Sequence, residues 1–110
     1  MAYNHEKRKY MNEAHLVKLC REARARARSG NEEDLFWELL VRVREDLKSD
    51  DPRDGILPFG NTRREMLINN IFQHFNHQYD WPLSLNISGT INRELLGKPE
   101  APAAAHGKIK

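Results

Sequence analysis

LFWELLVRVREDL, residues 35–47, is the most apolar segment of this chain and the largest source of core side chains. Its apolar residues recur at helical spacing and form one broad stripe, made of Leu35, Phe36, Leu39, Leu40, Val43 and Leu47. Asn31 is a good N-cap, and the acidic residues after it suit the positive end of a helix dipole. Pro52 and the polar residues before it end the pattern. The segment therefore predicts a central core helix over residues 31–49.

One further helix is predicted on each side of this core helix. Residues 5–28 are rich in helix formers, and Ser29-Gly30 provides a stop. The apolar stripe of this helix consists of Leu16, Leu19, Cys20, Ala23 and Ala27. Thr62 and Glu65 have the spacing of a capping box, with Asn61 as the competing N-cap, and predict a helix over residues 62–78. Its buried face is expected to contain Leu67, Ile68, Ile71, Phe72, Phe75 and Tyr79.

The remaining residues predict a loop, a short helix and a tail. Residues 51–61 contain two prolines and two glycines among apolar residues, which indicates a long ordered loop folded over the core. A short last helix is expected near residues 88–96. Residues 98–110 have almost no core-forming content and are predicted to be a disordered tail. We therefore expect an all-α protein, a small bundle of three main helices plus a short C-terminal helix and a long ordered loop, in a single domain over residues 1–97.

Composition excludes several classes of protein. The chain has 110 residues, with 18 Lys and Arg against 16 Asp and Glu, and its formal net charge is +2. The single cysteine excludes an internal disulfide and a multi-cysteine zinc site. No apolar run approaches the roughly 20 residues that span a bilayer, and the basic first residues lead into no apolar signal segment. We expect a cytoplasmic protein with no membrane partner.

A basic strip is the sharpest local feature of the first helix. On a helical wheel, Lys18, Arg21, Arg24 and Arg28 gather on one face, beside the apolar stripe. Arginine suits phosphate because its planar fork donates two hydrogen bonds and keeps its charge, so the strip could bind nucleic acid. The same side chains could instead pair with the acidic residues Glu32, Glu33 and Asp34 across the turn. The solvated or ion-paired interpretation is favoured.

Apolar side chains outside the core stripes are candidates for a protein-binding surface. Trp37 and Val41 lie one turn apart and outside the stripe of the core helix. Trp81 follows the third helix, in a corner formed with Pro82. Tryptophan offers a large contact area with few rotors and is a frequent interface anchor. For Trp81 a place in the core is favoured, whereas for Trp37 core and interface are evenly matched.

The helix over residues 62–78 also carries a polar, mostly uncharged face, made of Asn69, Asn70, Gln73, His74, Asn76 and His77. Amide side chains can bind adenine edges in a major groove, and Arg63 and Arg64 could hold phosphates. A helix-turn-helix requires a turn of about three or four residues, however, and about nine separate this helix from the next. A plain polar surface is therefore favoured.

Metal binding and catalysis have little support. His74, His77 and Asp80 have a suitable spacing for a metal, but a zinc site requires three or four well-placed ligands. Gly55 and Gly60 lack the lysine and hydroxyl residue of a phosphate-binding loop. We predict no metal, no cofactor and no catalytic residue.

The expected function is therefore that of a non-enzymatic regulatory or adaptor protein that binds a larger protein or nucleoprotein partner. The contact is expected to involve Trp37, Val41 and the arginines of the first helix, with Trp81 as a further candidate. The alternative is a nucleic-acid-binding protein that uses the basic strip on phosphates. Self-association into a homo-oligomer is a further option.

Overall fold

The computed structural model describes residues 8–48 and 56–99 of the chain. Within these ranges the elements are β1 (Lys9–Tyr10), α1 (Glu13–Arg26), α2 (Glu32–Leu47), α3 (Arg63–Gln78), β2 (Tyr79–Asp80) and α4 (Ile87–Glu94). The described protein is thus a small all-α bundle with three main helices and a short C-terminal helix, as the sequence predicts. The two strands are only two residues each and form a minimal sheet.

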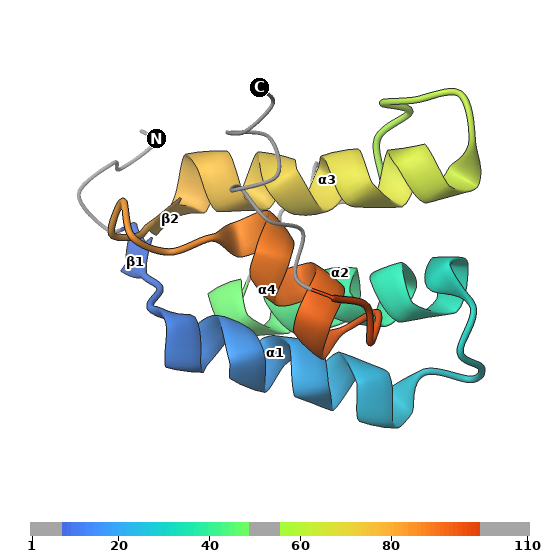
Figure 1. The fold of residues 1–110 in the computed structure, drawn as a ribbon. Helices are drawn as coiled ribbons and strands as arrows, with labels where there is room; N and C mark the ends of the chain where they lie inside the picture. The colour runs from blue at the N-terminus through green and yellow to red at the C-terminus, as the bar shows by residue number, and fades with distance from the viewer. Residues whose placement is uncertain (1–7, 49–55, 100–110) are drawn as a thin grey trace, which may run out of the picture.

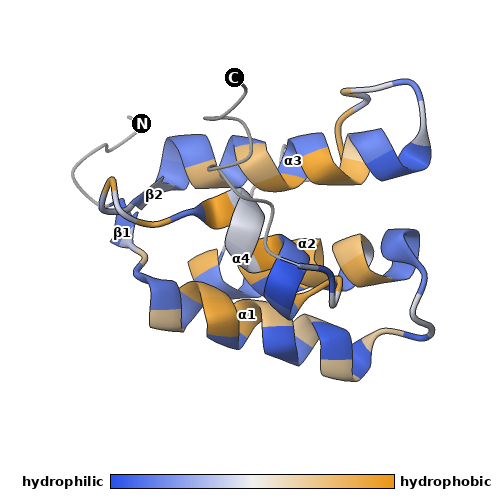
Figure 2. Ribbon diagram, in the orientation of Figure 1, coloured by the Kyte–Doolittle hydropathy of each residue, from blue (hydrophilic) through white to orange (hydrophobic). Residues whose placement is uncertain are grey.

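The central helix predicted from the sequence is the middle of the bundle. α2 packs along both α1 and α3, and α4 packs against α1. In the view of Figure 1, α4 lies in front and α2 behind, between α3 above and α1 below. Figure 2 shows the apolar sides of these helices turned toward the centre of the bundle. One side of α2 therefore faces away from the other described helices.

Each helix begins at a polar side chain that accepts a hydrogen bond from a free backbone N–H of the first turn. Asn31 caps α2 by accepting from the Asp34 N–H at 2.9 Å, and Thr62 caps α3 by accepting from the Glu65 N–H at 3.0 Å. The sequence predicts Asn31 and leaves Thr62 and Asn61 as competing caps, of which the structure uses Thr62. Asn12 and Asn86 cap α1 and α4 in the same way.

The first helix is shorter than predicted. The sequence predicts a helix over residues 5–28, but α1 begins at Glu13, after its cap Asn12. Lys9 and Tyr10 instead form β1, which pairs in parallel with β2, and the Met11 N–H donates to the Asp80 carbonyl at 2.7 Å. Helix-forming composition is overridden here by pairing with a segment about 70 residues away in sequence. Residues 1–7 lie outside the described part.

The core consists of the predicted stripes and a few additions. Of the residues predicted to be apolar and inward-facing, Ala27, Leu47, Ile68 and Phe72 are half-buried and the others are buried. Met11, Ile87, Ile91 and Leu95 complete the core. Phe75 packs edge-on against both Phe72 and Tyr79, with ring centroids 5.5 and 5.6 Å apart.

The loop before α3 covers the core only in part. Ile56 packs against the core, as predicted, but Leu57 and Phe59 are exposed. The Asn70 side chain fixes the loop, because it accepts from the Leu57 N–H at 2.8 Å and donates to the Leu57 carbonyl at 2.9 Å. Residues 49–55 lie outside the described part, as do residues 100–110 of the predicted tail. Lys98, the first residue of that tail, donates its backbone N–H to the Asn92 carbonyl at 2.8 Å.

Candidate protein-binding face

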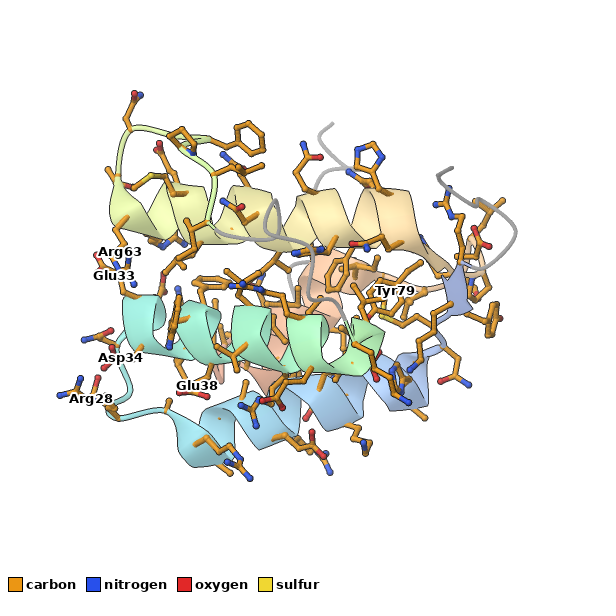
Figure 3. The ribbon with its side chains drawn as sticks, turned by 180° about the vertical axis from the view of Figure 1, so that it is seen from behind. Arg28, Glu33, Asp34, Glu38, Arg63 and Tyr79 are labelled. Carbon is orange, nitrogen blue, oxygen red and sulfur yellow. The ribbon has the colours of Figure 1, made fainter. Side chains whose placement is uncertain are left out.

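The side of α2 that turns away from the bundle carries both apolar side chains singled out in the central helix. We call this side the α2 outer face, and it comprises Glu33, Asp34, Trp37, Glu38, Val41, Arg44, Glu45 and Lys48. Trp37 and Val41 lie in its middle and are half-buried, with Trp37 also touching the core at its edge. Figure 3 views the molecule from this side, with α2 between α3 and α1. The structure thus brings Trp37 and Val41 together on one surface.

Trp37 is contacted by a side chain from the start of α3. The Arg63 guanidinium carbon lies 5.6 Å from the centre of the indole ring. A guanidinium at this distance is attracted to the electron-rich face of tryptophan. The contact places a guanidinium and an indole side by side on the same surface.

Trp37 stands between two hollows on the surface. The first, of about 190 Å³, is lined by charged side chains and Trp37: Arg28, Glu33, Asp34, Trp37, Glu38 and Arg63. The second, of about 320 Å³, is lined by Trp37, Val41, Arg44, Glu45 and Lys48. Arg28 comes from the α1–α2 connection and Arg63 from the start of α3, so three segments line the first hollow. A half-buried aromatic ring flanked by hollows is a shape that another protein surface can complement.

Charge on the α2 outer face is divided between its two edges. Glu38 and Glu45 lie on the edge toward α1, where Arg42 approaches their carboxylates at 3.7 and 3.6 Å. Arg44 and Arg63 lie on the edge toward α3. Figure 3 shows Glu38 and Arg63 on opposite sides of α2. Both edges therefore carry acidic and basic side chains together, because Arg42 stands beside Glu38 and Glu45 on one edge and Glu33 lies beside Arg63 on the other.

Trp81, the third predicted anchor, belongs to a different part of the surface. It follows β2, is half-buried and packs against the core, which matches the interpretation favoured from the sequence. It lines neither of the two hollows beside Trp37. Leu83, two residues later, is fully exposed.

The basic strip of α1 is exposed but partly neutralised. Lys18 pairs with Glu22 at 3.4 Å, and Arg21 pairs with Glu94 of α4 at 2.9 Å. Arg93 and then Arg21 hold the pKa of the Glu94 carboxyl below its usual range. Arg24 lies beside the position of Gly97, and Arg28 lines the first hollow beside Trp37. Lys18 and Arg21 are therefore paired with carboxylates, whereas Arg24 and Arg28 lie beside Gly97 and the first hollow.

The acidic residues across the α1–α2 turn have partners other than those considered from the sequence. The Glu32 carboxylate pairs with Lys98 and Arg64, and hydrogen bonds from Lys98 and then Arg64 hold its pKa below the usual range. Asp34 accepts a hydrogen bond from the Ser29 hydroxyl at 2.7 Å. Glu32 thereby joins the start of α2 to the start of α3 and to the residue after Gly97.

The amide-rich face of α3 is not a continuous recognition surface. Asn70 and His74 are buried, although the sequence places both on this face. Asn70 binds the loop at Leu57, and the His74 ring bonds with Gln78. Asn69 donates to the Phe59 carbonyl and is likewise used within the fold. The three residues with the spacing of metal ligands, His74, His77 and Asp80, are likewise not joined in one site, because Asp80 pairs with Arg8 at 3.1 Å.

A polar cluster around Asp46 gives no signal in the sequence. The Asp46 carboxylate accepts from the Tyr79 hydroxyl at 2.7 Å, contacts His15 Nε2 at 2.9 Å and pairs with Lys9 Nζ at 3.0 Å. Burial opposes ionisation, but hydrogen bonds from His15, Tyr79 and Lys9 outweigh it and lower the Asp46 pKa. Burial and the neighbouring carboxylate raise the Tyr79 pKa. The cluster joins β1, α1, α2 and the end of α3 through contacts within the fold.

Neither a membrane helix nor a metal cluster is found in the part of the chain that the structure describes. Over residues 8–48 and 56–99, no helix has the length and apolar character to cross a bilayer. In the same ranges, no group of three or more His, Cys, Asp and Glu side chains is placed to hold a metal ion. No protein-family model, curated protein or solved structure matches the chain.

Proposed function

We propose that this chain is a non-enzymatic regulatory or adaptor protein that acts by binding another protein through the α2 outer face. The observation that carries the proposal is the position of Trp37, half-exposed between two hollows and beside the Arg63 guanidinium. Tryptophan and arginine dominate the energetically important positions of protein interfaces. Val41 continues the apolar contact by one turn of α2.

The environment of the basic strip supports a protein partner over a nucleic acid. A protein that binds the phosphate backbone gains affinity by releasing counterions, which requires cationic side chains that are free to meet phosphate. Lys18 and Arg21 already have carboxylate partners in Glu22 and Glu94. Arg28 lines the hollow beside Trp37 and can contribute to a protein contact there.

Site-specific photo-crosslinking tests this proposal and captures whichever protein binds the face. A photoreactive amino acid is placed at Val41 and, as a matched control, at the exposed Ala25 of α1, and each variant is irradiated in the cells that make the protein. We expect discrete crosslinked products from position 41, fewer when Trp37→Ala is added, and none of these products from position 25. The same products from both positions, or none from position 41, would contradict the proposal.

A further inference from the structure

We draw no further inference here: the strongest candidate, the exposed apolar patch of Leu57 and Phe59 on the loop that Asn69 and Asn70 of α3 hold in place, carries nothing because nothing in the described part of the structure shows what covers it.

Discussion

The Tyr79 hydroxyl donates a 2.7 Å hydrogen bond to the Oδ2 atom of Asp46 and joins the end of α3 to the end of α2. Tyr79 is fully buried, and the Asp46 side chain is only 11% exposed. His15 Nε2 contacts the same oxygen at 2.9 Å, and Lys9 Nζ meets the other oxygen at 3.0 Å. A buried carboxylate requires partners of this kind, because an unpaired charge in the interior is strongly destabilising.

Tyr79→Phe should therefore destabilise the fold. The substitution removes one hydroxyl and leaves the Asp46 carboxylate with one donor fewer, which costs about 1–3 kcal/mol for a bond to a charged group. The free energy of unfolding, measured by urea denaturation, checks the expectation. Tyr10→Phe is the matched control, because Tyr10 is 60% exposed and its loss of a hydroxyl should leave stability unchanged. Equal stability of both variants would show that the bond contributes nothing.

Asp46 should also make stability depend on pH at the acidic end. Its pKa is lower in the folded protein than in the unfolded chain, so its contribution is present above the unfolded value of about 4. The contribution is lost as pH falls toward the folded pKa, because the unfolded state then binds the proton more readily. We expect Asp46→Asn to be less stable than the native chain at pH 7 and the difference to shrink at pH 3. A difference that stays constant over this range would refute the assignment.

Local patterns in the sequence predict the bundle well. The stripes around Leu39 and Ile71, together with the caps Asn31 and Thr62, depend on neighbours within one or two turns, and the structure confirms them. Trp37 and Val41 are recognisable for the same reason, since a residue outside the apolar stripe of a helix must face elsewhere.

Contacts between distant segments are not predictable in the same way. Lys9 and Tyr10 lie in a segment with the composition of a helix. They form a strand only because they pair with the two residues that follow α3. Asn70 and His74 are polar residues buried by partners such as Leu57 and Gln78, which periodicity cannot supply. Asp46 gives no signal because its importance depends on Tyr79, 33 positions away.

Truncation of Trp37 should affect stability less than truncation of a core aromatic residue. Trp37 is half-buried and gains little more than its edge contact and the Arg63 interaction, so Trp37→Ala should cost below about 2 kcal/mol. Phe75→Ala removes a fully buried ring and should cost about 3–5 kcal/mol. Thermal and urea denaturation of the two variants give the comparison. If Trp37→Ala is as damaging as Phe75→Ala, Trp37 belongs to the core and not to a binding face.

Binding to nucleic acid, the alternative function, should be weak and only mildly dependent on salt. Within the described residues, Arg24 and Arg28 are the members of the basic strip without a carboxylate partner at ion-pair distance. Two phosphate contacts give a slope of about −1.8 in the logarithm of affinity against the logarithm of salt concentration. A labelled duplex and a labelled RNA, titrated at several salt concentrations, provide the measurement. A slope steeper than about −4, abolished by replacing Arg21, Arg24 and Arg28 with Glu, would favour the nucleic-acid function instead.

Cys20 should be chemically inert as long as the protein is folded. Burial, together with Glu94, raises the pKa of this thiol to about 12, and the side chain is fully buried. Thiolate is the reactive form, so both its scarcity and its burial should slow labelling by an aromatic disulfide reagent at about pH 8. The reagent should react within the mixing time with an exposed thiol such as that of Ala25→Cys, and with Cys20 only after urea unfolds the chain. Rapid reaction of Cys20 in the native protein would show that α1 opens readily from the bundle, which would also weaken the use of a rigid α2 face as a docking surface.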